Sequence, residues 1–323
     1  MTRAPVESTV FVESAGRLHF GVLDLAGTLG RWFGGIGAAA PAPTLQLSAH
    51  PADTLSVEGV DAERAAAFAR RFLDHHGLKT GAMLCVERSL PAHAGLGSGT
   101  QLGLAVARAL AELYGLAVDA PTLARTVGRG ERSAIGTWTF AGGGLVVEGG
   151  RRAASDTVGP LLTRHPFPAS WRCVVAVPRC VPPMSGHAVS EAFAQLPPPP
   201  ESEAQSISHL VLLKLLPALA DGDLPAFGAA LTAIQQITGR WFAPVQGGTF
   251  APGPTEELVR RMIEWGAVGV GQSSWGPTVY GIVDGDAPGR RLADRVRHLE
   301  SATEGVYCGA FRAEGARVWK SNR

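Results

Sequence analysis

A glycine-rich loop at residues 91–101, PAHAGLGSGTQ, is the part of the chain best suited to chemistry. It lies between a strand-like run at 80–88 and the clearest amphipathic helix, which apolar spacing predicts over 99–114. Main-chain N–H groups at a helix N-terminus attract anions, and glycines let phosphate oxygens come close. We therefore predict a phosphate site; the alternative is a strand-to-helix turn without a ligand. Its predicted ligands are His93, Gly95, Leu96, Gly97, Ser98, Gly99, Thr100 and Gln101.

Two arginines follow in the stretch GRGERSAIGTW at residues 128–138. Guanidinium groups pair bidentately with phosphate oxygens, so Arg129 and Arg132 are predicted to bind a substrate that carries several phosphate charges. For either arginine the alternative is a solvated helix face, where an exposed charge contributes little.

Polar residues also gather near the start of the chain. Residues 6–13 alternate and predict a strand, and GRLHFG at 16–21 follows, so the strand is expected to deliver polar groups into a glycine-flanked bend. The segment 30–40 places Arg31 and Phe33 among glycines. This composition suits a backbone pressed against a ligand, or a tight turn, better than a packed strand.

Hydrophobic periodicity predicts alternating strands and helices along the chain. Strands are predicted at 44–48, 80–88, 145–148, 172–177, 268–270, 278–283 and 305–311, and helices at 61–76, 99–114, 119–129, 206–220 and 255–265. This mixture argues for an α+β protein of two sheet-and-helix lobes, with the site in the cleft between them. We place the boundary near Ala169, which divides the chain into an N-terminal phosphate-binding unit at 1–168 and a C-terminal substrate unit at 169–323.

Composition excludes several classes of partner. The 29 Lys and Arg against 28 Asp and Glu give a net charge of +1 without a basic run, so a small-molecule substrate is expected and no nucleic acid. The first residues lack a signal peptide's apolar core, and no stretch reaches the roughly 18 apolar residues of a membrane span. A cytoplasmic protein without a membrane partner is expected. The scattered cysteines are expected to be reduced core residues: Cys85, Cys173, Cys180 and Cys308.

The glycine loop resembles the second signature of the GHMP kinases, the family of galactokinase, homoserine kinase, mevalonate kinase and phosphomevalonate kinase. The string at 16–21 resembles the first motif of that family, and GVGQSSWGPTVYG at 269–281 resembles its third. Three ordered motifs across most of the chain are specific. The resemblance implies a two-lobed GHMP-kinase-like α+β fold, in which each lobe is a mixed or antiparallel sheet packed with helices.

The same resemblance implies that Glu131, with Ser98, binds Mg²⁺. Where the kinases carry an aspartate that engages the acceptor hydroxyl, this chain has Trp138 or a neighbour. Some GHMP kinases transfer phosphate without that aspartate, so an ATP-dependent small-molecule kinase is the alternative activity.

Four strings, GRLHFGVLDL, RWFGGIG, GLGSGTQ and GRGERSAIGT, are similar to one non-kinase branch, the β-ribofuranosylaminobenzene 5'-phosphate synthase family. This resemblance implies decarboxylating transfer of a ribosyl group from phosphoribosyl pyrophosphate to 4-aminobenzoate or 4-hydroxybenzoate, with release of CO₂ and diphosphate, in methanopterin-type coenzyme biosynthesis. It also implies Mg²⁺ without an organic cofactor, and a homodimer. A third hypothesis is a regulator that binds phosphometabolites and has lost the chemistry.

With this resemblance, Arg17, His19 and Asp24 are the predicted catalytic residues. An arginine would pair with the benzoate carboxylate, and His19 or Asp24 could orient the aryl amine or take a proton. The histidine and the aspartate could equally satisfy loop backbone groups. The predicted substrate-binding residues are Arg31, Phe33, Gly34, Gly35, Gln246, Ser273 and Ser274.

Overall fold

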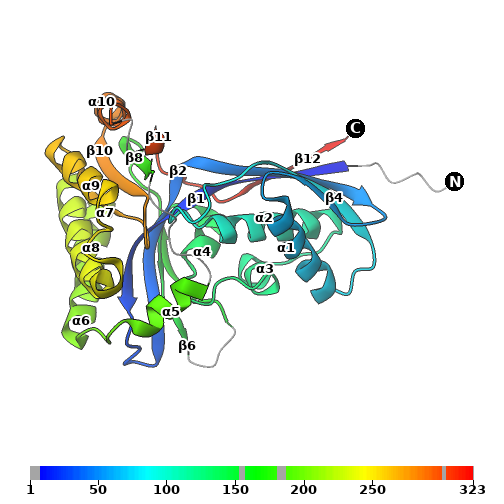
Figure 1. The fold of residues 1–323 in the computed structure, drawn as a ribbon, viewed down its shortest axis with the longest axis horizontal. Coiled ribbons are helices and arrows are strands. Elements are labelled where there is room, and N and C mark those ends of the chain that lie inside the picture. The colour runs from blue at the N-terminus through cyan, green and yellow to red at the C-terminus, as the bar shows by residue number, and fades with distance from the viewer. Residues whose placement is uncertain (1–7, 153–156, 180–186, 300–302, 323) are drawn as a thin grey trace.

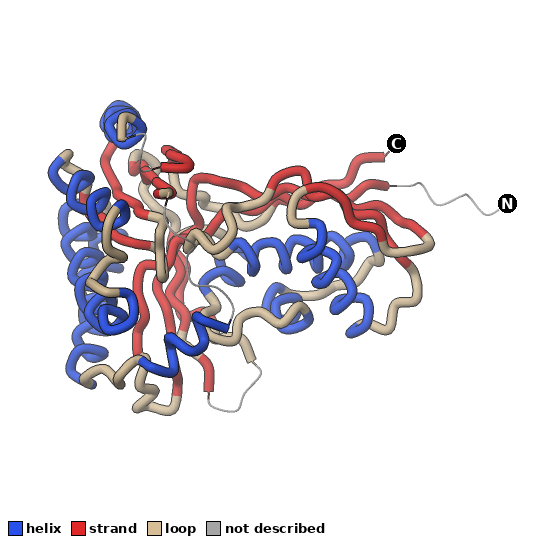
Figure 2. Tube along the Cα trace, viewed as in Figure 1, coloured by secondary structure: helices blue, strands red, loops and turns tan. Residues whose placement is uncertain are grey.

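The computed structural model describes residues 8–152, 157–179, 187–299 and 303–322. Within these ranges the strands form two sheets, and helices pack against both (Figures 1 and 2). The strand pairs are antiparallel except β3 with β4, which is parallel. The expected α+β class is confirmed.

The larger sheet has eight strands in the described residues and follows the order β12-β1-β2-β4-β3, with β5 and β6 pairing β2 and β7 pairing β5. Its strands are β1 Ser8–Asp24, β2 Arg31–Ala52, β3 Ser56–Gly59, β4 Gly81–Arg88, β5 Leu145–Glu148, β6 Arg151–Arg152, β7 Leu161–His165 and β12 Arg317–Asn322. The helices that follow its first strands lie on one side of it in Figure 1. They are α1 Ala62–His75, α2 Ser98–Leu113, α3 Ala120–Thr126 and α4 Ile135–Gly142.

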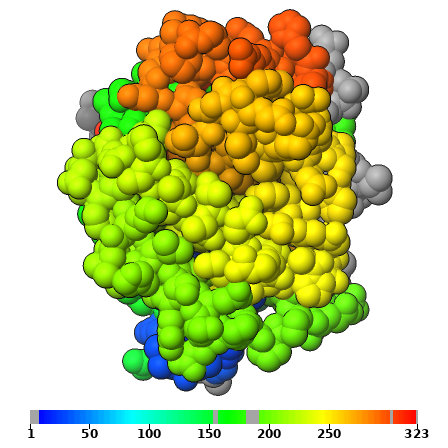
Figure 3. All heavy atoms as spheres, turned by 90° about the vertical axis from the view of Figure 1, so that its left-hand side faces the viewer, coloured from blue at the N-terminus to red at the C-terminus, as the bar shows by residue number. Residues whose placement is uncertain are grey.

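The smaller sheet has four strands in the order β11-β8-β10-β9. They are β8 Trp171–Pro178, β9 Val268–Gln272, β10 Val279–Asp284 and β11 Thr303–Gly309. The remaining helices are α5 His187–Gln195, α6 Glu201–Leu210, the π-helical η1 Val211–Leu215, α7 Leu216–Asp221, α8 Leu224–Gln246, α9 Pro254–Glu264 and α10 Asp286–Arg297. Figure 3 shows that these C-terminal helices cover one face of the molecule, with blue atoms of the N-terminal strands at its lower edge.

The first strand is longer than expected. The sequence predicted a strand that ends in a bend at 16–21, whereas β1 continues through this motif to Asp24. Where the bend was expected, the pairing of β1 with β2 shifts register between Ala15 and Arg17 and between His19 and Gly21. The prediction of a bend was wrong because β2 pairs with β1 along its whole length and holds the chain extended.

The glycine-rich segment 30–40 is also strand, as the first half of β2. Most of its glycines make room for neighbouring parts of the same chain. A Cβ at Gly37 would lie 2.4 Å from the Leu18 carbonyl oxygen and 2.5 Å from Ile135. The expectation against a packed strand was therefore wrong. Close packing of β1 and α4 against β2 requires glycine here just as a ligand would.

The helix expected over 119–129 ends at Thr126, because Gly128 and Gly130 adopt positive φ angles of 67° and 86°. Arg129 and Arg132 consequently lie in a loop rather than on a helix face. The 23-residue helix α8 was not predicted. Its glycines obscured the pattern, although Gly228 and Gly239 let Val268 and Thr249 pack directly against the helix.

Two further features bear on the expected organisation. The division at residue 169 stays a prediction, but the last strand, β12, pairs with β1 and so belongs to the larger sheet. One hydrophobic cluster joins Phe20 and Ile36 of the larger sheet to Trp171 of the smaller sheet and Phe227 of α8. The two sheets therefore share a core.

Cys85, Cys173 and Cys308 are free thiols, and Cys180 lies outside the described residues. Burial raises the pKa of Cys173 well above its usual value, which keeps it protonated. Among the helices of the described residues, none combines the length and apolar character that crossing a membrane requires.

Candidate active site

A cavity of about 280 Å³ opens between the two sheets. Its walls come from β1 and β2, from the loop 128–133, from α5 and α8, and from the segment after β9. It has a cationic side at the loop 128–133 and an aromatic side at α5 and α8. The predicted site residues that line it are Arg17, His19, Phe33, Gly34, Thr100, Arg129, Glu131, Arg132, Gln246 and Ser274.

Hydrogen bonds join the glycine loop to the third motif, residues 269–281. The Gly95 carbonyl oxygen accepts hydrogen bonds from the Arg17 guanidinium and from Ser273 Oγ, at 2.6 Å for the serine. The Thr278 amide donates to the Ala94 carbonyl oxygen at 3.2 Å. A Cβ at Gly95 would come within 2.3 Å of the Ser273 carbonyl oxygen, so only glycine fits. These contacts hold the start of α2 beside the cavity.

Helix α2 begins without a side-chain cap, because its N-cap residue is Gly97 in a left-handed conformation with φ 73°. The first N–H groups of such a helix carry partial positive charge and need acceptors. Guanidinium groups lie over the same turn, since a Cβ at Gly99 would be 3.0 Å from Arg129 Nη2 and 3.2 Å from Arg64 Nη2. Positive charge from two sources therefore converges on Gly99.

Arg129 lies here although not every nitrogen of its side chain has a hydrogen-bond acceptor. Its guanidinium stacks over the Phe68 ring at 5.0 Å, and its Nε is buried with no hydrogen-bond acceptor among the described residues. Burial, followed by the charges of Arg64 and Arg71, lowers its pKa. Clustered cations repel one another, so an anion bound here would relieve that cost.

Arg132 has a similar arrangement on the next turn of the loop. Its guanidinium lies over the Phe193 ring at 5.4 Å, and its Nη1 is buried without an acceptor among the described residues. Cation–π contact stabilises the charge but does not replace a hydrogen-bond acceptor. Arg132 thus lines the cavity between its cationic and aromatic sides and carries a buried donor without an acceptor among the described residues.

Arg17 and His19 line the cavity from β1. Burial lowers the pKa of Arg17 to about 10, which leaves it charged at neutral pH. Burial and the neighbouring Arg17 charge lower the pKa of His19 to about 3, so its imidazole is neutral. The His19 main-chain amide donates to Ser273 Oγ at 2.9 Å, which fixes this part of β1. His19 is therefore a hydrogen-bonding group of the cavity lining and a weak base.

Several predicted residues do not line the cavity. The Asp24 carboxylate accepts from the amides of Ala26 and Gly27 at 2.7 and 3.0 Å, so it caps its own turn. Arg31 donates to the Gly150 carbonyl oxygen at 2.7 Å. Both side chains therefore stabilise the tip of the larger sheet. For Asp24 this is the alternative stated above, in which the carboxylate satisfies loop backbone groups.

The glycine loop contributes to the cavity chiefly through Thr100. Ser98 is buried and Gln101 donates to the Gly136 carbonyl oxygen at 3.0 Å, which ties α2 to α4. His93 is exposed, in a left-handed conformation with φ 57°. The predicted residues outside the lining are Asp24, Arg31, Gly35, His93, Gly95, Leu96, Gly97, Ser98, Gly99, Gln101 and Ser273.

The cavity also contains residues that were not predicted, among them Phe193, Thr238, Phe242 and Trp275. Trp275 falls within the third motif and could have been chosen for that reason. The other three lie on α5 and α8, far from any motif, and no local pattern distinguishes them from core residues.

Glu131 is the one carboxylate among the described residues that line the cavity. It is exposed and forms no ion pair within the described ranges. Across those ranges no group of three or more His, Cys, Asp or Glu side chains could hold a metal ion. Mg²⁺ commonly binds through one or two carboxylates and the phosphate oxygens of a substrate. Glu131 fits such an ion when diphosphate accompanies it, and the cavity-lining Thr100 is better placed than Ser98 to assist.

Comparisons with known proteins identify the family. The model of the GHMP kinases N terminal domain matches residues 63–144, and that of the GHMP kinases C terminal domain matches residues 215–300. The β-ribofuranosylphenol 5'-phosphate synthase of Methanothermobacter thermautotrophicus is 34% identical over 301 residues, covering 87% of this chain and 90% of that protein. The enzyme of the same name from Archaeoglobus fulgidus is 35% identical over 88% of this chain and 91% of its own length.

The chain belongs to the β-ribofuranosylphenol 5'-phosphate synthase family. Both resemblances expected from the motifs, to the GHMP kinases and to this synthase branch, are confirmed. Solved structures show the fold of the family. Homoserine kinase from Cytophaga hutchinsonii superposes with a TM-score of 0.67 over 99% of both chains at 15% identity. Phosphomevalonate kinase from Streptococcus pneumoniae reaches 0.68 over 94% of this chain and 99% of its own, at 15% identity.

One position separates this synthase from the kinase pattern expected at the start of α4. Trp138, which the motif resemblance places where the kinases carry an aspartate, donates from its indole Nε1 to the Gly159 carbonyl oxygen at 2.8 Å. The side chain therefore supports the adjacent loop. Since Glu131 is an isolated carboxylate in the described lining, the cavity is richer in cationic than in acidic groups.

Proposed function

We propose that this chain transfers the phosphoribosyl group of phosphoribosyl pyrophosphate to 4-aminobenzoate or 4-hydroxybenzoate, with loss of CO₂ and release of diphosphate. The observation that carries the proposal is the two-sided cavity. Arg129 lies beside the start of α2 and Arg132 follows in the same loop, both with unused hydrogen-bond donors, and aromatic rings form the other side. A polyanionic sugar donor and an aromatic acceptor are complementary to these two sides.

The names of the relatives support the same chemistry. A β-ribofuranosylphenol 5'-phosphate contains an arene, a ribose and a phosphate, and the archaeal relatives are named for making it. A phenol is the product expected from 4-hydroxybenzoate, and an aniline is the product expected from 4-aminobenzoate. We carry both acceptors forward as substrates to be compared.

The catalytic contribution of the protein is electrostatic in this proposal. Breaking the C1–O bond of the donor leaves its electron pair on diphosphate, so negative charge grows near Arg129 and the start of α2. Arg132 and Arg17 add positive charge to the cavity lining. Positioning both reactants in one cavity lowers the entropic cost of bringing them together in the reacting geometry. No protein nucleophile is required.

When bound, Mg²⁺ would offset the charge on the leaving diphosphate. Glu131 would hold it from the cavity wall, with Thr100 nearby and Ser98 as the sequence-based candidate. His19, kept neutral by its low pKa, would donate or accept a hydrogen bond without adding a further positive charge. A cytoplasmic homodimer stays a prediction of the family resemblance.

The test is a balanced product assay with purified protein. Phosphoribosyl pyrophosphate, Mg²⁺ and carboxyl-labelled 4-aminobenzoate or 4-hydroxybenzoate should yield labelled CO₂, diphosphate and a ribosylated arene in equal amounts. A parallel reaction contains ATP in place of the sugar donor. Phosphoryl transfer from ATP without CO₂ release would instead establish a kinase. Binding of both substrates without any product would favour the regulator hypothesis.

A further inference from the structure

The aromatic side of the cavity is built from four rings that come from distant parts of the chain. Phe193 of α5 contacts Phe33 edge-on at 5.8 Å, Phe242 at 5.8 Å and Trp275 at 5.4 Å between ring centroids. Phe242 and Trp275 lie 4.6 Å apart. All four line the cavity. Their edge-on arrangement leaves ring faces and edges available to a further flat ring.

The cationic end of this aromatic wall is Arg132. Its guanidinium stacks on Phe193, the ring that contacts the other three, and its Nη1 has no acceptor among the described residues. A carboxylate bound there would supply the missing acceptor in a charge-assisted hydrogen bond. The position also adjoins Arg129 and Glu131, where the sugar donor is proposed to bind.

Helix α8 adds a buried hydroxyl without a partner to the same cavity lining. Thr238 lies one turn before Phe242 on α8, lines the cavity and is only 7% exposed. Its Oγ1 has no hydrogen-bond partner in the described structure. The side-chain amide of Gln235, one turn earlier on α8, already has partners. It donates to the Phe20 carbonyl oxygen and accepts from the main-chain N–H of Gln272. An orphaned buried hydroxyl is costly unless a ligand or water satisfies it.

We infer that these features form the acceptor subsite and fix the orientation of a para-substituted benzoate. The ring packs against Phe193, Phe242 and Trp275. Its carboxylate binds Arg132, and its para amino or hydroxyl group donates a hydrogen bond to Thr238 Oγ1. This inference rests on the proposed function and assigns the binding of the acceptor to residues that no motif identified.

The orientation is the one that the reaction demands. The ring carbon that bears the carboxylate attacks C1 of the ribose, while the C1–O bond breaks and its electron pair leaves with diphosphate. The bond to the carboxylate then breaks, CO₂ departs, and its electron pair restores the aromatic ring. The attacking carbon must therefore face the donor at the cationic side. Positive charge develops on the para substituent, where an accepting oxygen of Thr238 stabilises it.

Direct binding of the acceptor tests the inference without turnover. Calorimetry with 4-hydroxybenzoate, 4-aminobenzoate and unsubstituted benzoate is performed on the full chain in the presence of Mg²⁺ and diphosphate. Thr238→Val removes the hydroxyl but keeps the shape of the side chain. We expect it to weaken binding of the two para-substituted acids about tenfold and to leave benzoate unchanged. Thr232→Val, on the same helix but away from the cavity lining, should change none of the three affinities.

A second variant tests the other end of the ring. Arg132→Gln should weaken all three acids by about tenfold or more, because all share the carboxylate. If Thr238→Val weakens benzoate as much as 4-hydroxybenzoate, or alters neither, the para group does not contact Thr238 and the inference is overturned. It is likewise overturned if the wild-type protein binds none of the acids under these conditions.

The product assay separates this inference from the proposed function. If wild-type protein releases CO₂ but the three affinities do not follow the expected pattern, the function stands and the acceptor lies elsewhere. If the pattern appears but no CO₂ is formed from either acid, the subsite stands and the proposed reaction is wrong.

Discussion

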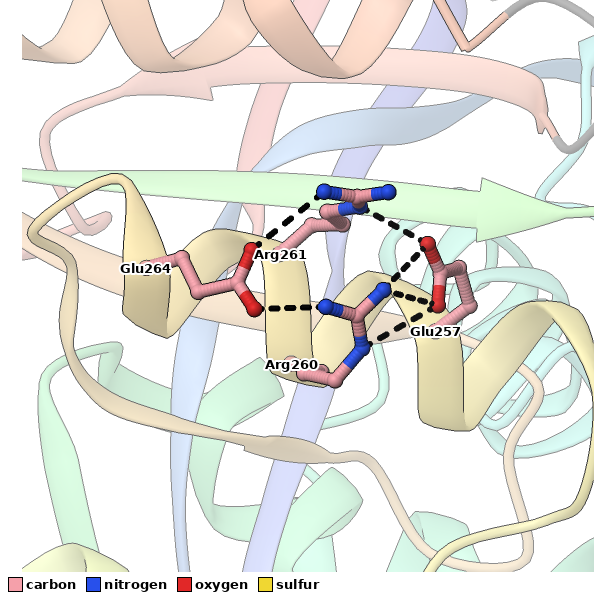
Figure 4. Close-up of polar contacts among 4 residues, drawn as sticks. All are labelled: Glu257, Arg260, Arg261 and Glu264. Atoms are coloured by element: carbon pink, nitrogen blue, oxygen red, sulfur yellow. Dashed lines mark hydrogen bonds and ion pairs between the residues drawn. The ribbon is translucent and has the colours of Figure 1, made fainter.

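The arginines of the cavity and those of helix α9 differ in their exposure to water and in whether they have acidic partners. On α9, Arg260 and Arg261 bind Glu257 and Glu264 in an exposed network of ion pairs one turn apart, with distances from 2.5 to 3.4 Å (Figure 4). In the cavity, Arg129 and Arg132 contact aromatic rings and retain buried nitrogens without acceptors.

The contrast shows which charges the fold satisfies by itself. The exposed pairs form locally along one helix and contribute little to stability, because water solvates the separated charges almost as well. The cavity arginines are held together at an energetic cost, and a substrate anion is the partner that would offset it. Five predictions test this contrast, from the largest expected effect to the smallest.

The first replaces the cavity arginine that lies beside the start of α2. Arg129→Gln should lower kcat/KM about 10²- to 10³-fold, as when one donor to a developing anion is lost. Because the variant also removes a repelling charge, its melting temperature should equal or exceed that of the wild type. Steady-state kinetics and thermal melts measure the two effects. Unchanged kinetics would mean that Arg129 is a scaffold residue.

The second concerns stabilisation by the anion itself. Diphosphate with Mg²⁺ at about 100 times its Kd should stabilise the wild-type protein by about 2.7 kcal/mol. This gain should be reduced in Arg129→Gln and retained in Arg260→Gln. Thermal melts with and without diphosphate measure it. An equal gain in both variants would place the anion away from the cavity.

The third addresses the metal. Glu131→Gln should raise the Mg²⁺ concentration needed for half-maximal rate by about tenfold or more, because it removes the carboxylate of the cavity lining. Thr100→Val should have a smaller effect of the same kind, and Ser98→Ala a smaller one than Thr100→Val. Magnesium titrations of the rate rank the three. A larger effect at Ser98 would restore the sequence-based assignment.

The fourth uses pH. The pKa of His19 is about 3 in the folded protein against 6.5 in an exposed histidine, so between these values the unfolded chain binds the extra proton. Acidification through this window should therefore destabilise the protein, by up to about 1.4 kcal/mol per pH unit from this group. Glu148 acts oppositely: burial raises its pKa to about 7, so its contribution favours folding as pH falls from 7 to 4.5.

His19→Gln separates the two groups. Urea unfolding from pH 7 to 4 should show a shallower loss of stability on acidification in the variant than in the wild type. Parallel curves for the two proteins would contradict the low pKa of His19.

The fifth prediction sets the baseline. Arg260→Gln should leave both the free energy of unfolding and kcat/KM almost unaltered, because water solvates this exposed side chain. Urea unfolding and kinetics measure both. A large loss of activity would contradict the contrast between exposed and cavity arginines.

Much of the fold could be predicted because its signals are local. The glycine loop, the amphipathic stripe of α2 and the short buried strands each follow from side chains within one turn or a few residues. Predictions failed where another segment decided the conformation. Residues 30–40 became strand because β1 and α4 pack against them, and α8 was missed because its glycines serve contacts with Val268 and Thr249.

The sequence by itself determined the glycine loop and the helix after it, the order of the three motifs, the family and the choice of Arg129 and Arg132 as candidates, because each depends on neighbours along the chain. Only the tertiary structure decided that Asp24 and Arg31 support turns, that His19 is neutral, and that Phe193, Thr238, Phe242 and Trp275 share a cavity with Arg132. Burial and partners depend on residues distant in sequence, which the packing of the two sheets brings together.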